Sequence, residues 1–112
     1  MPKKILSISP NAALRTTSHI MLQNQRFEVV SVANARETHL ALRSGDFDLV
    51  ILGVAVDAKA KREIASSIRK SCEHAQILEL CRISPEIPDA EHHLIGAEPE
   101  DVDQTVRRIL KS

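Results

Sequence analysis

Hydrophobic and polar positions along the chain follow two periods, one typical of strands and the other of helices. Five short runs are rich in Ile, Leu and Val, as buried strands are. We expect strands at residues 5–8, 27–32, 46–52, 76–80 and 93–95. The run Leu49-Val50-Ile51-Leu52 is apolar at every position, which indicates a strand covered on both faces.

Helical spacing of apolar residues separates most of these strands. We expect helices at residues 10–25, 35–44 and 61–72, and a last helix from residue 99. Ser9 is expected to cap the first helix, with Pro10 at its first position. Asn34 and Glu37 form a pattern like a capping box, and Gly45 is a natural stop. The last helix has the clearest apolar face, made of Val102, Val106, Ile109 and Leu110.

Strands that alternate with helices predict right-handed βαβ units and a parallel sheet with helices on both faces. Five strands in one domain of residues 1–112 favour the flavodoxin-like order 2-1-3-4-5. The segment 82–91 is an exception, because it holds Pro85 and Pro88 and is shorter than a mean helix of about 11–12 residues. We expect a loop there, or at most one turn, so that the fourth helix is missing or reduced.

Composition excludes several classes of protein. The 15 basic and 15 acidic residues give no net charge, whereas a nucleic-acid-binding protein normally has a basic excess. The longest apolar stretch, 49–56, is far below the ~18 residues that span a membrane, and MPKKILSIS lacks the features of a signal peptide. The two cysteines, Cys72 and Cys81, favour reduced buried thiols over a disulfide framework. We therefore expect a cytoplasmic protein that binds neither nucleic acid nor membrane.

Three stretches carry a resemblance to a known family. They are KKILSISPN, FEVVSVANARETHLALRSGDFDLVILG and AEHHLIGAEPEDV. In this order and spacing the chain resembles a response-regulator receiver domain of the chemotaxis-regulator type, over nearly its whole length. The resemblance implies a role in two-component signal transduction.

The resemblance also implies where the reactive residues of that family would lie. The phosphoacceptor aspartate after the third strand corresponds to Gly53, and the two acidic residues that hold magnesium correspond to Ser9 and Pro10. The Thr or Ser after the fourth strand corresponds to Cys81, and the Lys after the fifth to Gly96. Without a nucleophile, carboxylates for the cation or the lysine, phosphoryl transfer has no machinery. We expect a degenerate pocket with no catalytic residue, metal or cofactor.

The leading hypothesis is therefore a non-catalytic pseudo-receiver. It would act by contact with another signalling protein or domain, or by self-association. One alternative is a phosphoaccepting regulator that uses a displaced carboxylate such as Asp57. Another is a redox or small-ligand sensor that uses Cys81, which would need a lowered thiol pKa. His92 and His93 are adjacent on a strand and should point to opposite faces, so a shared metal ion is not expected.

Overall fold

Strands and helices alternate along most of the chain, as the sequence predicts. The computed structural model describes residues 2–111. Its elements are β1 (Lys4–Ile8), α1 (Ala12–Asn24), β2 (Glu28–Val32), α2 (Ala35–Ser44), β3 (Leu49–Leu52), α3 (Ala58–Ser71), β4 (Gln76–Cys81), β5 (His92–Ile95) and α4 (Pro99–Ile109).

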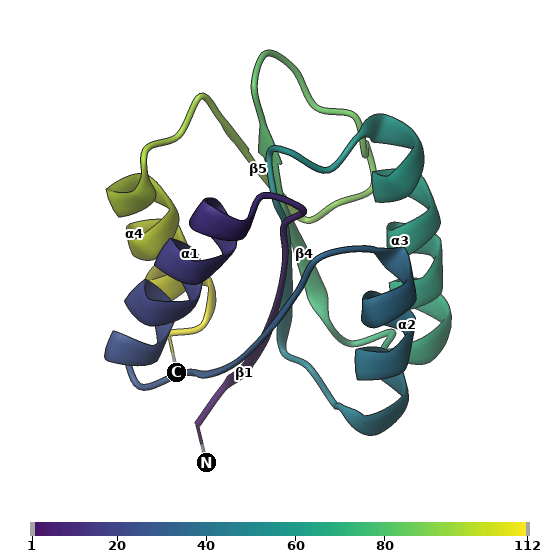
Figure 1. Cartoon of the computed structure of the whole chain (residues 1–112), viewed down its shortest axis with the longest axis horizontal. Coiled ribbons are helices and arrows are strands. Elements are labelled where there is room, and N and C mark those ends of the chain that lie inside the picture. Colours follow the sequence, from purple (N-terminus) through teal and green to yellow (C-terminus); the bar gives the residue numbers. More distant parts are fainter. Residues whose placement is uncertain (1, 112) are drawn as a thin grey trace.

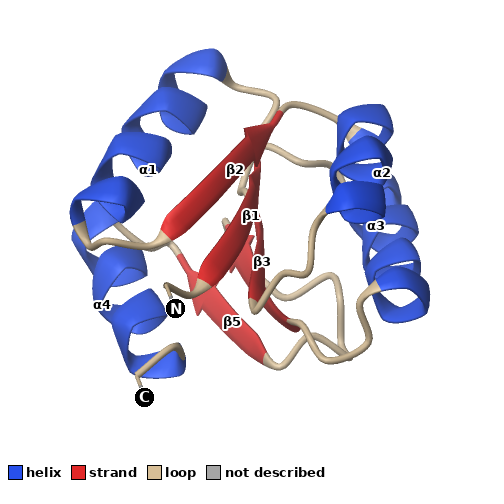
Figure 2. Ribbon diagram, turned by 90° about the horizontal axis from the view of Figure 1, so that it is seen from below, coloured by secondary structure: helices blue, strands red, loops and turns tan. Residues whose placement is uncertain are grey.

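The five strands form one sheet in the order β2-β1-β3-β4-β5. Every neighbouring pair is parallel, with Ile5 opposite Val29 on one side and opposite Leu49 on the other. Helices α1 and α4 cover one face of the sheet, and α2 and α3 cover the other (Figure 1, Figure 2). The predicted flavodoxin-like architecture is confirmed.

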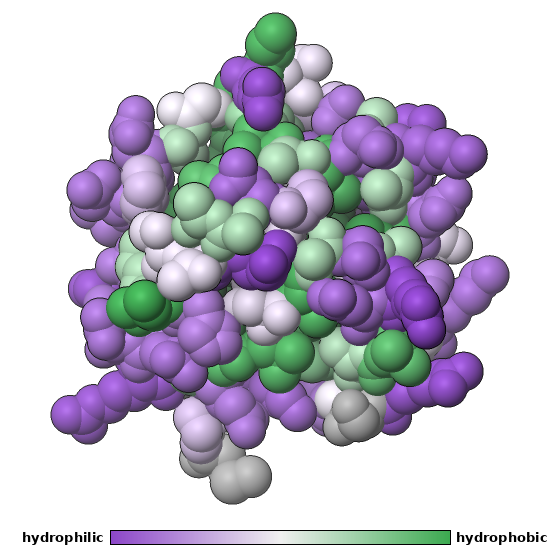
Figure 3. Space-filling model, in the orientation of Figure 1, coloured by the Kyte–Doolittle hydropathy of each residue, from purple (hydrophilic) through white to green (hydrophobic). Residues whose placement is uncertain are grey.

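The sheet divides the core into two layers of apolar side chains. Along β3, Val50 and Leu52 belong to the α2–α3 layer, while Leu49 and Ile51 belong to the α1–α4 layer. This is why β3 is apolar at every position. The predicted face of α4 packs in the second layer, where Val106 is fully buried. Hydrophilic side chains gather along both flanks of the molecule, and apolar ones lie between them (Figure 3).

Two predicted helix starts are wrong, and both errors come from the capping residue. Helix α1 is capped by Asn11, whose side chain accepts from the amide of Leu14, and not by Ser9. Ser9 stays extended because its amide donates to the carbonyl of Val32, as a strand residue would. Helix α3 begins three residues early because the side chain of Asp57 caps it.

The start of β3 differs from the predicted one, whereas the end of α2 agrees with it. Strand β3 begins at Leu49 and not at Asp46, because the chain before it forms a loop. At α2 the amide of Glu37 donates to the side chain of Asn34, but the Glu37 carboxylate accepts from the amide of Ala33 and not from that of Asn34, so the predicted capping box is only half formed. The helix ends at Ser44 as predicted.

The segment 82–91 forms no helix, as predicted. Ile87 and Ala90 nevertheless bury their side chains in the α2–α3 layer, so this loop is packed onto the core. Among the described residues, no helix is long and apolar enough to cross a membrane.

Candidate functional site

A cavity of about 320 Å³ opens where the carboxyl ends of four strands meet the α1–α4 layer. Open α/β sheets usually bind their ligands at this edge. Four of the predicted pocket residues line the cavity, namely Ser9, Gly53, Cys81 and Gly96. The fifth, Pro10, is exposed and is not part of the lining. The structure thus brings together residues that are up to 87 positions apart in the chain (96 − 9).

Gly53 follows β3 directly and lies against the end of β1. Its amide donates to the carbonyl of Ile8 over 2.8 Å. A Cβ at position 53 would lie 2.5 Å from the same oxygen and 3.3 Å from the Cβ of Ser9. Because a backbone oxygen cannot move aside without shifting β1, packing requires a glycine here. A carboxylate does not fit at this position on the present backbone.

The chain that leaves β1 is held by hydrogen bonds to the backbone. The Ser9 hydroxyl donates to the carbonyl of Asn11 over 3.4 Å, and the Arg15 guanidinium donates to the carbonyl of Ser9 over 3.0 Å. None of the described residues that line the cavity is an aspartate or a glutamate. The lining therefore lacks the carboxylate oxygens that Mg²⁺ prefers.

Apolar side chains form most of the cavity wall. The face of α1 that follows helical spacing points into the cavity and contributes Leu14, Thr17, Ser18, Met21 and Leu22. Of these five only Leu22 is fully buried, and Leu14 is 44% exposed. The face of α1 thus borders an open space in place of a tightly packed core.

Gly96 closes the pocket after β5 in a left-handed conformation, with φ of 60°. Its amide donates to the carbonyl of Cys81 over 2.9 Å. A Cβ at position 96 would meet no atom within 4 Å, so a side chain has room but would strain the backbone. A side chain is therefore blocked by steric overlap at position 53 and disfavoured by the backbone conformation at position 96.

Cys81 lacks the activation that a redox sensor needs. Its side chain is buried, and burial together with the negative charge of Glu79 raises the pKa of the thiol to about 11. Lys61 opposes this shift but does not reverse it. Both cysteines are free and buried, as predicted.

The other candidate residues have structural roles. Asp57 caps α3, and its Oδ1 atom accepts from the amide of Ala60 over 2.8 Å. His92 and His93 point to opposite faces, as expected. The Nε2 of His92 lies 2.7 Å from the side-chain oxygen of Gln76, and the Nε2 of His93 lies 2.8 Å from the carbonyl of Ile87.

Sequence reasoning missed a cluster of buried charges between α3, β4 and the loop 82–91. The side chains of Lys61 and Glu79 are 1% and 0% exposed, and their charged atoms are 3.0 Å apart. The Lys61 ammonium also donates to Glu86 over 3.1 Å and to the carbonyl of Leu80. The Glu79 carboxylate accepts further bonds from the amides of Glu86 and Ile87.

Mutual hydrogen bonding keeps both buried groups charged. Burial alone would lower the pKa of Lys61, but the bonds to Glu79 and Glu86 outweigh it and leave the pKa raised. Burial alone would raise the pKa of Glu79, but the bonds from Lys61, Ile87 and Glu86 leave it lowered. Two signals pointed to this cluster: Lys61 shares the helical stripe of Ile64 and Ile68, and Glu79 interrupts an apolar strand.

The chain is similar in structure to solved response regulators, although its sequence matches no family model. No protein-family model matches the sequence, and no curated protein matches it significantly. The chemotaxis response regulator CheY4 of Vibrio cholerae superposes with a TM-score of 0.83 at 24% identity, over 98% of this chain and 100% of that one.

Two further solved structures are similar. The response regulator TrrA of Thermotoga maritima, in complex with Mg²⁺ and BeF, matches with a TM-score of 0.80 at 25% identity, over 96% of this chain and 99% of that one. A two-component response regulator from Clostridium difficile matches with a TM-score of 0.84 at 18% identity, over 97% of this chain and 96% of that one. The chain therefore has the fold of response-regulator receiver domains.

Proposed function

We propose that this chain is a receiver-like domain of two-component signalling that acts by protein–protein contact and is not phosphorylated on an aspartate. The observation that carries the proposal is the carbonyl of Ile8, which lies 2.5 Å from where a side chain at Gly53 would begin. Gly53 is hydrogen-bonded to the end of β1, so the present backbone leaves no room at this position for the side chain that would carry the nucleophile, which supports the proposal.

The absence of carboxylates from the described cavity lining supports the same proposal. Transfer of a phosphoryl group to a carboxylate also needs a cation to offset the charge on the transferring oxygens. The displaced acceptor Asp57 has little support, because its carboxylate caps α3 and lies outside the described lining.

Incubation with acetyl phosphate and magnesium, followed by intact-mass spectrometry, tests the proposal. We expect no phosphoryl adduct on the wild-type chain or on Gly53→Asp, while a receiver domain with an intact phosphoacceptor is modified under the same conditions. Calorimetric titration with millimolar Mg²⁺ should give no saturable heat. An adduct on the wild-type chain that disappears in Asp57→Asn would establish the displaced-carboxylate alternative instead.

For the contact itself, the segment 82–95 offers two exposed isoleucines, one of which is the most exposed large apolar side chain of the described residues. Ile83, in the loop that follows β4, is 86% exposed, and Ile95, on the edge strand β5, is 55% exposed. Apolar side chains near a sheet edge favour association. If the chain self-associates through this edge, sedimentation velocity should show loss of association in Ile83→Asp. The control Leu40→Asp, at an exposed leucine of α2, should still associate.

A second candidate function, binding of a small ligand, is favoured by the cavity. A volume of about 320 Å³ with apolar walls fits the ordinary range for small-molecule sites. Ser18→Phe would fill the cavity, whereas Ala13→Phe adds the same ring to an exposed position of α1. Binding of an apolar fluorescent probe that Ser18→Phe abolishes and Ala13→Phe preserves would support this function.

A further inference from the structure

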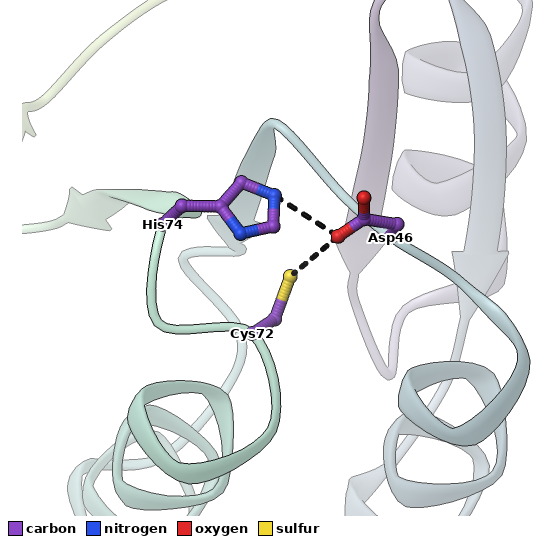
Figure 4. Close-up of side chains that lie close together, drawn as sticks. All are labelled: Asp46, Cys72 and His74. Carbon is purple, nitrogen blue, oxygen red and sulfur yellow. Dashed lines mark hydrogen bonds and ion pairs between the residues drawn. The ribbon is translucent and has the colours of Figure 1, made fainter.

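Three side chains with metal-binding atoms meet at the amino end of the sheet, far from the cavity. Asp46 lies in the loop before β3, Cys72 follows the last turn of α3, and His74 lies in the turn that leads to β4 (Figure 4). Their ligand atoms all lie within 4.8 Å of one another. The pairing of residue 46 with residues 72 and 74 is a product of the fold, because β3 and β4 start side by side.

One carboxylate oxygen is the centre of this group. The Oδ1 atom of Asp46 lies 3.0 Å from the Nε2 of His74 and 3.8 Å from the Sγ of Cys72. A catalytic triad would need the imidazole between the thiol and the carboxylate. Here the carboxylate is in the middle, and burial together with Asp46 raises the pKa of the Cys72 thiol. The arrangement is therefore unsuited to nucleophilic catalysis.

We propose that Asp46, Cys72 and His74 form a binding site for Zn²⁺ or a chemically similar divalent transition metal. A thiolate, an imidazole and a carboxylate are the three ligand types that tetrahedral Zn²⁺ accepts. Standard zinc–ligand bond lengths place neighbouring ligand atoms about 3.3–3.6 Å apart in a tetrahedron. The two separations from Asp46, 3.0 and 3.8 Å, bracket this range. The third pair, His74 and Cys72, lies within 4.8 Å, so the exposed His74 side chain has to move towards Cys72 to complete the site.

The three ligands differ in burial, so that Cys72 is held in place while Asp46 and His74 can move. Cys72 is 3% exposed, and its Sγ donates to the carbonyl of Phe47 over 3.4 Å. Asp46 and His74 have side chains that are 83% and 55% exposed, so they can close on an ion from the solvent side. Three protein ligands leave one position for water. Binding replaces the thiol proton, which passes to solvent, by the metal.

Soft ligands decide which metal the site selects. Mg²⁺ favours oxygen ligands and an octahedral shell, whereas a thiolate with an imidazole favours zinc and its neighbours. This site is therefore independent of the Mg²⁺ chemistry considered at the cavity. Because it joins the loop before β3 to the end of α3, an ion bound there would stabilise the fold by mass action.

Binding of Co²⁺ in place of Zn²⁺ tests the proposal, because a Co²⁺–thiolate bond absorbs light. Titration of the reduced wild-type chain with Co²⁺ should produce thiolate-to-metal charge-transfer absorption that saturates at one equivalent, and Zn²⁺ should bleach it. Cys72→Ala should lose this absorption, and Cys81→Ala, which removes the other buried thiol, should keep it. Persistence of the band in Cys72→Ala, or no band in the wild-type chain, would overturn the assignment.

An exposed ligand provides a variant that keeps the fold. His74→Gln should weaken Zn²⁺ binding at least about 10-fold in competition with a chromophoric chelator, while His92→Gln, on β5, should leave the affinity unchanged. Circular dichroism verifies that both variants are folded. Equal affinities of His74→Gln and the wild-type chain would exclude the site as proposed.

Discussion

The cavity at the carboxyl edge of the sheet and the charged cluster beneath the loop 82–91 differ in their chemistry, although both lie near the end of β4. The described cavity lining contains no carboxylate, whereas the cluster holds Lys61, Glu79 and Glu86 within hydrogen-bonding distance. In a cavity that opens to solvent, water can solvate a charged group, so such a group needs no partner. In a closed layer, charges persist only when each one is paired. The comparison indicates that the charged groups of this end of the molecule serve its architecture.

A charge introduced behind the cavity should have the largest effect. Val106→Asp in α4 buries a carboxylate where the layer offers only apolar neighbours, since Val106 is 0% exposed. We expect the free energy of unfolding to fall by about 5 kcal/mol, or folding to fail. Urea denaturation measures the loss, and Gln104→Asp, at an exposed position of the same helix, should change stability little. Wild-type stability in Val106→Asp would refute the packing of α4.

Removal of one charged partner from the cluster should lower the free energy of unfolding by less than Val106→Asp does, but still by several kcal/mol. Lys61→Met leaves the Glu79 carboxylate buried without its cation, and we expect a loss of about 3 kcal/mol. The exposed Lys59→Met is the control. The double variant Lys61→Met/Glu79→Gln removes both charges yet keeps an oxygen for the amides of the loop. It should recover most of the loss, and failure to recover would show that the charges themselves stabilise the loop.

Glycine replacements sharpen the comparison at the cavity itself. Gly53→Ala forces a methyl group against the carbonyl of Ile8, and we expect a loss of about 2 kcal/mol. Gly96→Ala meets no atom but holds φ of 60°, so its loss should be about 1 kcal/mol. Urea denaturation of both variants tests the order. A smaller loss at position 53 than at 96 would mean that β1 and β3 separate easily.

The smallest of the expected effects is the contribution of the Lys61–Glu79 cluster to the pH dependence of the free energy of unfolding. The folded pKa of Glu79 is lowered from its ordinary value of 4.5, so its contribution is present above pH 4.5 and is lost as the pH falls through the folded pKa. The folded pKa of Lys61 is raised from 10.5, so its contribution is present below pH 10.5 and is lost as the pH rises through the folded pKa. Denaturation of the wild-type chain and of Lys61→Met/Glu79→Gln should give free energies of unfolding that differ by a constant between the two limits, and beyond each limit the wild-type value should fall relative to that of the variant.

Local patterns predicted most of the fold. The stripe of α4, the stop after Ser44 and the all-apolar β3 are features of adjacent residues, and they survive in the structure. The strand order was predicted from five strands in a chain of this size, which favour the flavodoxin-like order, and the structure has this order. Errors occurred where two local signals competed, as when Asn11 and not Ser9 capped α1.

Pairings between distant residues could not be predicted from the sequence. Lys61 and Glu79 are 18 positions apart. The stripe of α3 and the apolar run of β4 mark each of them as unusual, but neither pattern shows that the two side chains meet. Asp46 and Cys72 meet only because the strands beside them are parallel neighbours. The obstruction at Gly53 was equally hidden, because a glycine in a sequence does not reveal which atom occupies the place of its side chain.

Hydrogen exchange should detect one consequence of the buried carboxylate. The loop 82–91 has no helix or strand, and loop amides ordinarily exchange quickly with solvent. The amides of Glu86 and Ile87 donate to Glu79 over 3.0 and 3.1 Å, so they can exchange only when the loop leaves the sheet. We expect nuclear magnetic resonance to find these two amides protected to the degree of strand amides, while those of Arg82 and Ile83 exchange rapidly. The loop 82–91 is thus expected to open only together with the core it covers.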